Sequence, residues 1–165
     1  MCGIVAYIGN KDAVPILVQG LKRLEYRGYD SAGLATIDKD EMKILKCEGK
    51  VGDLENLLDE STVRGFLGIG HTRWATHGVP NNLNAHPHSD SSNKISIIHN
   101  GIIENYTLLR EALEKDGVNL LTDTDTEVLV QLIGRIYSSG SLTFTESIQS
   151  ALNDVVGTYG IAAVC

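Results

Sequence analysis

The sequence predicts a mixed fold of strands and helices organised as one domain. Short apolar runs rich in β-branched residues occur near both ends and in the middle of the chain, and helix-periodic segments separate them. The chain has 165 residues, of which 42% are hydrophobic and 21% are charged, which suits a globular protein with a sizeable core. We therefore expect one domain in which helices cover sheets.

The first half of the chain opens with a strand and a helix. Residues 3–9 form an apolar run bounded by glycines, which predicts a buried strand. Apolar residues then recur at helical spacing, and because Pro15 fits only in a first turn, the helix should begin near Asp12. The other elements expected in this half are a loop at 27–32, paired strands at 34–37 and 42–47, a short helix at 53–58 and a strand at 66–69.

The second half begins with a polar stretch, 79–93, that is rich in Pro, Asn, His and Ser. It is short, so we expect an ordered loop and not a domain linker. Thr124 and Glu127 have the spacing of a capping box and mark the start of a helix over 125–137. The other expected elements are a strand at 95–99, helices at 106–115 and 145–156, and a strand at 159–165. Because the chain stops inside an apolar run, we expect a domain that is incomplete at its C-terminal end.

Composition excludes several classes of protein. The formal net charge of −7 disfavours nucleic-acid binding, which usually needs a basic surface. Three sparse cysteines fit a reducing compartment, and the chain has neither a signal peptide nor an apolar run long enough to span a bilayer, so we expect a cytoplasmic location. His86 and His88 lack partners at zinc-site spacing, so we expect no metal and no other cofactor.

Cys2 is the most informative single residue, because removal of Met1 would give it a free α-amino group. The amine, with a reference pKa of about 7.7–8.0, can accept the proton of a thiol whose reference pKa is about 8.5. The thiolate is the reactive form of cysteine, and an N-terminal amine is a known activating base. The alternative from this position alone is an ordinary mobile terminus.

Three further segments offer groups suited to an amino-acid substrate. Arg73 could bind a carboxylate through two hydrogen bonds. The alternative is that Arg73 makes a surface ion pair and Trp74 fills the core. Asn100 and Gly101 could supply an oxyanion hole, or only a hairpin turn. Asp125 could bind an ammonium group, or only interact with the dipole of its helix.

Taken in order, these blocks resemble a known family. The matching blocks are residues 2–5, 25–33, 71–78, 99–101 and, more weakly, 124–127. They are similar to the N-terminal glutaminase domain of the glutamine–fructose-6-phosphate aminotransferases (isomerizing), or glucosamine-6-phosphate synthases, within the N-terminal-nucleophile glutamine amidotransferases. The resemblance implies an α+β fold, a four-layer αββα sandwich of two antiparallel sheets. It also implies that residues 1–165 are the glutaminase domain, without the sugar isomerase domains.

The resemblance implies roles for the reacting groups. Cys2, freed of Met1, would attack the side-chain amide of glutamine while its α-amino group shuttles the proton. Asn100 and Gly101 would stabilise the oxyanion. Trp74, among the substrate-binding residues, would gate the passage of ammonia, and Arg27 would support the site near the nucleophile.

The resemblance also implies how substrates bind. Arg73, helped by Thr76 and His77, would bind the α-carboxylate of L-glutamine, and Asp125 would bind its α-ammonium group. Fructose 6-phosphate would be a substrate only in a full-length enzyme, through the isomerase domains. An exposed sheet edge would allow pairing of two copies, so a homodimer is a further expectation.

Two alternative interpretations of the sequence remain open. The chain could be the glutaminase half of a different amidotransferase. It could also be a catalytically inactive fragment that acts as a binding module, which retention of Met1 would favour because the α-amine of Cys2 would then be blocked. A metalloprotein is a more distant third.

Overall fold

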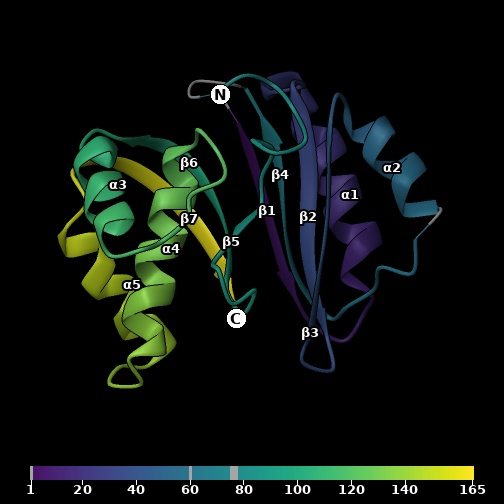
Figure 1. The fold of residues 1–165 in the computed structure, drawn as a ribbon. Coiled ribbons are helices and arrows are strands. Elements are labelled where there is room, and N and C mark those ends of the chain that lie inside the picture. The colour runs from purple at the N-terminus through teal and green to yellow at the C-terminus, as the bar shows by residue number, and fades with distance from the viewer. Residues whose placement is uncertain (1, 60, 75–77) are drawn as a thin grey trace.

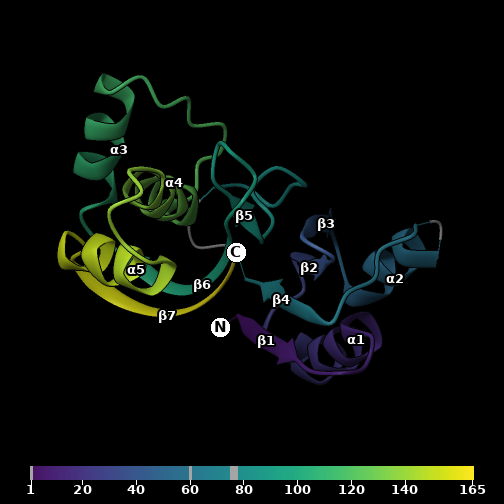
Figure 2. The same ribbon diagram turned by 90° about the horizontal axis from the view of Figure 1, so that it is seen from below.

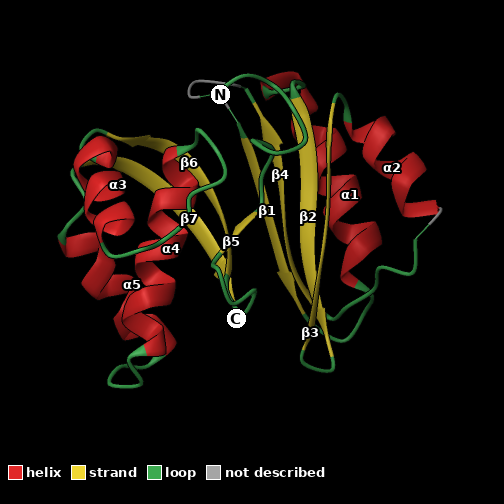
Figure 3. Ribbon diagram, in the orientation of Figure 1, coloured by secondary structure: helices red, strands yellow, loops and turns green. Residues whose placement is uncertain are grey.

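The computed structural model describes residues 2–59, 61–74 and 78–165, which form an α+β fold in four layers. Two antiparallel sheets face each other in the middle, and helices cover the outer face of each sheet (Figures 1 and 2). Figure 3 shows the same layers coloured by secondary structure. The αββα sandwich that the resemblance implied is therefore confirmed.

The first sheet has four antiparallel strands in the order β1-β4-β2-β3. Its strands are β1 (Gly3–Ile8), β2 (Ser31–Asp38), β3 (Glu41–Glu48) and β4 (Leu67–Arg73). Its outer face is covered by α1 (Ala13–Leu24) and α2 (Val51–Asp59), with a short 3₁₀ turn, η1 (Glu25–Arg27), after α1. The Asp12 carboxylate accepts the backbone N–H of Val14, so α1 is capped where Pro15 required it to begin.

The second sheet has three antiparallel strands in the order β5-β6-β7. Its strands are β5 (His88–Ser89), β6 (Ser96–Ile103) and β7 (Gly157–Val164). Its outer face is covered by α3 (Tyr106–Lys115), α4 (Asp125–Ser138) and α5 (Phe144–Asn153). All three helices were expected, and α3 has the predicted bounds.

Apolar side chains fill three layers of the sandwich. Leu17, Leu21 and Leu34 belong to a core between the first sheet and its helices, and Leu129 and Ile133 belong to the matching core of the second sheet. Between the two sheets lies a smaller apolar cluster that contains four fully or almost fully buried residues, Ala35, Ile69, Ile98 and Val164. Burial of these side chains provides the main favourable term for folding.

Strand bounds are where the sequence-based predictions were most often wrong. The predicted strand at 95–99 continues through Asn100 and Gly101, so the Asn-Gly pair is not a hairpin turn. β7 extends this pairing, with Asn100 opposite Gly160 and Gly101 opposite Tyr159. Strand pairing also explains three other differences. It extends β2 into the predicted loop 27–32, carries β4 past the predicted end at 69 to Arg73, and creates β5 inside the predicted loop 79–93.

The capping box predicted at the start of α4 forms only in part. Thr124 accepts the backbone N–H of Glu127, but the Glu127 carboxylate accepts the N–H groups of Leu121 and Thr122 instead of that of Thr124. The complete capping box is at α5, where Thr143 and Glu146 satisfy each other's backbone N–H groups. Glu127 thus fixes the chain that leads into α4, and α4 in turn positions Asp125.

Within the described ranges, the helices are all too short or too polar to cross a bilayer.

Candidate active site

A cleft of about 420 Å³ opens between the two sheets and holds most of the predicted site residues. Its size lies in the range of small-molecule sites. Both sheets and the first turn of α4 contribute to its lining, which includes Cys2, Arg27, Arg73, Trp74, Asn100, Gly101 and Asp125. Two further predicted residues, Thr76 and His77, lie outside the described residues. Residues far apart in sequence therefore meet where the strands of the two sheets end.

The thiol of Cys2 is held by the backbone of Trp74. Its Sγ lies 3.2 Å from the Trp74 backbone nitrogen, which donates to it, and 3.5 Å from the Trp74 carbonyl oxygen. Cys2 directly precedes β1, and Trp74 directly follows β4, the neighbour of β1 in the sheet. The antiparallel pairing of these strands thus brings Cys2 beside Trp74.

The Asn100 side chain bridges the two sheets beside this thiol. Its Nδ2 donates to the Cys2 carbonyl oxygen at 3.1 Å, and its Oδ1 lies 2.9 Å from Nε2 of His71. Gly101 follows with a φ of +139°, and a Cβ on it would lie 1.9 Å from the carbonyl oxygen of Thr158. Only glycine therefore fits here, because a side chain would be strained and would clash with β7.

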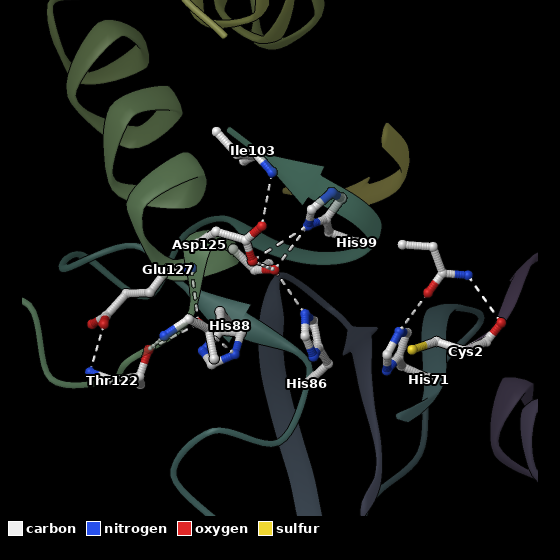
Figure 4. A network of polar contacts seen from close by, with 12 residues as sticks. Cys2, His71, His86, His88, His99, Ile103, Thr122, Asp125 and Glu127 are labelled. Atoms are coloured by element: carbon white, nitrogen blue, oxygen red, sulfur yellow. Dashed lines mark hydrogen bonds and ion pairs between the residues drawn. The ribbon is translucent and has the colours of Figure 1, made fainter. Parts of the chain in front are cut away.

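Opposite charges are buried on either side of the cleft. Arg73 at the end of β4 is only 3% exposed, so the surface ion pair considered for it is wrong. Burial lowers the pKa of Arg73, while the charges of Cys2, Asp30 and Asp125 act against that shift. Asp125 is buried in the first turn of α4, where its Oδ2 accepts the backbone N–H of Ile103 at 3.0 Å (Figure 4).

Aromatic and cationic side chains lie around the mouth of the cleft. Trp74 is 46% exposed, so it does not fill the core, and its ring meets that of Tyr29 edge-on with centroids 5.5 Å apart. The Arg27 guanidinium lies 5.8 Å from the centre of the Tyr26 ring. Of these side chains, Trp74 and Arg27 line the cleft that contains the Cys2 thiol.

Four buried histidines form a cluster that the sequence did not reveal: His71, His86, His88 and His99. His86 and His99 line the cleft, whereas His71 and His88 do not. The rings of His71 and His86 pack with centroids 4.3 Å apart, and those of His86 and His88 are 4.8 Å apart. His86 and His88 were considered only for metal spacing, His71 and His99 entered only as part of the matching blocks 71–78 and 99–101, and no periodic pattern links the four. Their closeness could be recognised only after the pairing of β4 and β6 was known.

Burial keeps three of these histidines neutral. It lowers the pKa of His71 to about 4 and those of His86 and His88 well below the usual value, and the nearby positive charge of Arg73 acts in the same direction. Among the described residues, no group of three or more His, Cys, Asp or Glu side chains is arranged to hold a metal ion.

One threonine joins the histidine cluster to the acid of the cleft. The hydroxyl of Thr126 lies 2.8 Å from Nε2 of His86 and 3.0 Å from Nδ1 of His99, and it lies 3.4 Å from Oδ1 of Asp125 (Figure 4). Lys46 holds the loop that carries His86, because its Nζ donates to three backbone carbonyls of that loop. The Asp125 carboxylate is thus contacted by a threonine that two histidines hold in place.

Comparison with known families agrees with this geometry. Residues 52–145, more than half of the chain, match the family described as the glutamine amidotransferase domain. The chain belongs to this family. Curated relatives named glutamine–fructose-6-phosphate aminotransferase [isomerizing] include those of Bacteroides thetaiotaomicron, 54% identical over 98% of this chain, and Clostridium tetani, 52% identical over all of it. The chain spans about a quarter of the length of these relatives, 26% and 27%.

Two solved structures have the same fold. The glutamine phosphoribosylpyrophosphate amidotransferase of B. subtilis, complexed with ADP and GMP, matches 99% of this chain with a TM-score of 0.85 and 31% identity. A structure described as the allosteric regulatory enzyme of purine biosynthesis matches 99% with a TM-score of 0.87 and 32% identity. This chain covers 35% of each of those chains. The glutamine amidotransferase domain thus has the N-terminal-nucleophile hydrolase architecture.

Proposed function

We propose that this domain hydrolyses the side-chain amide of L-glutamine to glutamate and ammonia, with Cys2 as the nucleophile. One observation carries the proposal. The Cys2 thiol and the Asn100 amide line one cleft with Arg73 and Asp125. The Asn100 Nδ2 donates to the backbone carbonyl oxygen of Cys2 at 3.1 Å, which places the amide beside the nucleophilic residue. A nucleophile, an oxyanion donor and two opposite charges are the groups needed to hold an amino acid and cleave an amide.

The reaction requires that Met1 be removed, so that Cys2 has a free α-amine. The thiol proton passes to that amine, and the sulfur attacks the side-chain carbonyl carbon of glutamine. The oxyanion that forms accepts hydrogen bonds from the Asn100 Nδ2–H and the Gly101 backbone N–H. Collapse of this intermediate expels ammonia, which takes the proton from the amine, and water then hydrolyses the thioester to glutamate and regenerates the thiol.

Substrate binding depends on the charged groups at the two sides of the cleft. Arg73, with Thr76 and His77, binds the α-carboxylate of glutamine, while Asp125 binds the α-ammonium group. Holding both ends of the amino acid orients its amide toward the thiol, and positioning of this kind can supply a large part of a rate enhancement. Arg27 supports the nucleophile from the rim.

In the natural polypeptide, a second reaction would consume the released ammonia. The relatives' name indicates transfer of the amide nitrogen to fructose 6-phosphate, and this step belongs to isomerase domains outside residues 1–165. Trp74, exposed at the mouth of the cleft, gates the exit of ammonia. A reactive free thiol needs a reducing compartment, so we place the reaction in the cytoplasm. The exposed start of β7 offers an edge for pairing two copies.

The test compares glutamate production by the parent with that of two cysteine variants, each in the natural polypeptide that contains this sequence. Cys2→Ala should reduce turnover to background, whereas Cys165→Ala, which removes an exposed thiol, should leave it unchanged. Turnover by Cys2→Ala would refute the assignment of Cys2 as the nucleophile. Glutamine binding without turnover in a parent lacking Met1 would instead favour a regulatory binding module.

A further inference from the structure

We propose that His71 is a positioning residue for this reaction, holding the Asn100 amide in the orientation that presents its N–H group to the oxyanion. The inference rests on the proposed glutaminase function and deepens it. His71 does not line the cleft, so it would act only through Asn100.

The contacts form one line from His71 to the nucleophile. In Figure 4 two dashed lines join His71 and Cys2 through the amide between them, which is that of Asn100. Nε2 of His71 lies 2.9 Å from Oδ1 of Asn100, and Nδ2 of Asn100 lies 3.1 Å from the Cys2 carbonyl oxygen. One Nδ2 hydrogen is used in the bond to Cys2, which leaves the second for the oxyanion.

The protonation of His71 determines the direction of its hydrogen bond. Burial lowers its pKa to about 4, so the ring is neutral near pH 7 and carries a single N–H. The Asn100 Oδ1 can only accept, and the 2.9 Å contact therefore requires this proton to be on Nε2 of His71. A neutral donor of this kind orients the amide without adding a buried positive charge beside the thiol.

The imidazole is itself held in place. His71 lies in the middle of β4, with Ile4 of β1 on one side and Gly33 of β2 on the other, and it is 1% exposed. The ring of His86 packs against it with centroids 4.3 Å apart. A ring fixed by strand pairing on both sides and by a stacked neighbour can fix the amide that it contacts.

A rotated Asn100 amide would be penalised at both of its ends. Its NH₂ group would face the N–H of His71, and its oxygen would face the carbonyl oxygen of Cys2. Donation from His71 to Oδ1 also polarises the amide, which strengthens Nδ2–H as a donor. A correctly oriented and polarised Nδ2–H gains most when negative charge develops on the substrate oxygen, so His71 should influence kcat more than KM.

The test measures kcat and KM for glutamine hydrolysis in the natural polypeptide. His71→Leu removes the donor, whereas in His71→Gln the side-chain amide can still donate near the position of Nε2. We expect His71→Leu to lower kcat about 10-fold with little change in KM, and His71→Gln to restore most of that loss. Thr36→Val is the matched control, because it removes a buried hydrogen bond from the same sheet, to Arg64, far from the thiol.

A double-mutant comparison separates positioning from a general structural role. If His71 acts through Asn100, adding His71→Leu to Asn100→Ala should cause almost no further loss of kcat. The inference would be overturned if the kcat loss of the double variant equalled the product of the two single losses. It would also be overturned if His71→Gln lost as much kcat as His71→Leu. An inactive parent lacking Met1 would instead overturn the proposed function, so the two failures are distinguishable.

A measurement on the parent alone covers the case in which His71→Leu does not fold. Nitrogen chemical shifts of the labelled His71 ring report its tautomer between pH 6 and 8. We expect a neutral ring protonated at Nε2 throughout this range. A ring protonated at Nδ1 could not donate to Asn100, and the inference would be wrong.

Discussion

The two ends of the space between the sheets have opposite chemistry. At the end near the C-terminus in Figure 1, Ile69, Ile98 and Val164 pack in an apolar cluster. At the end near the N-terminus, only a few residues along the same strands, the buried positions are His71 and Arg73 on β4. The apolar end joins the sheets by packing alone, while the polar end needs a specific partner for each buried group.

This contrast separates the residues that mainly stabilise the fold from those that mainly orient the side chains of the site. Apolar packing tolerates replacements of similar size and needs no particular direction. Hydrogen bonds at the polar end fix side-chain directions, at the cost of removing polar groups from water. Changes at the polar end should therefore alter turnover or pH dependence, whereas changes at the apolar end should alter stability alone.

The largest effect should come from Asn100→Ala, at the polar end. Loss of the Nδ2–H donor should lower kcat by about 10²–10³, with the KM for glutamine nearly unchanged, because the donor acts mainly on the oxyanion. Steady-state kinetics of glutamate formation measure both constants. A parental kcat would show that Asn100 is not an oxyanion donor.

The second-largest effect should be a loss of folding stability at acidic pH, caused by protonation of the buried histidines at the polar end. The folded pKa of His71, about 4, lies below the unfolded value near 6.5, so the unfolded chain binds more protons between these values. Stability should thus be lost as the pH falls through this window, by about 3 kcal/mol from His71 alone. The shifts of His86 and His88 act in the same direction.

Hydrogen exchange of β4 amides, corrected for intrinsic rates, measures this loss between pH 7 and pH 4. His71→Gln, which has no titrating ring, should make the pH dependence shallower. An equal slope in the parent and in His71→Gln would mean that His71 is not held neutral by burial.

A smaller effect is expected from Asp125→Asn, which keeps an oxygen for the N–H of Ile103 but removes the negative charge. The KM for glutamine should rise by about 10- to 100-fold, the usual contribution of a charge-assisted hydrogen bond, while kcat changes less. Inhibition by glutamate, which has the same α-amino group, should weaken in parallel. An unchanged KM would remove Asp125 from the binding site.

The smallest effect should come from Ile98→Val, at the apolar end. Removing one buried methylene group there should destabilise the domain by about 1 kcal/mol. We expect kcat and KM to stay at parental values, and thermal denaturation measures the stability change. A change in kcat from this substitution would contradict the separation between the two ends.

The sequence predicted the apolar parts of the structure well and the polar parts less well. Helices such as α3 and α4 have a local periodicity, and Cys2 is informative through its position alone. The path of β6 through Asn100 and Gly101 depends on pairing with β7, which no local pattern encodes. The role of Thr126 as a link from His86 and His99 to Asp125 could not be predicted either, since three separate segments create it.

The most direct test of the central claim, that Cys2 is an N-terminal nucleophile, is the mass of the polypeptide before and after reaction with a glutamine analogue that carries an electrophile in place of the amide. We predict a protein that lacks Met1 and gains one adduct, which peptide mapping places on Cys2, with glutamine slowing the reaction. A protein that lacks Met1, hydrolyses glutamine and yet is modified elsewhere or not at all would contradict the account.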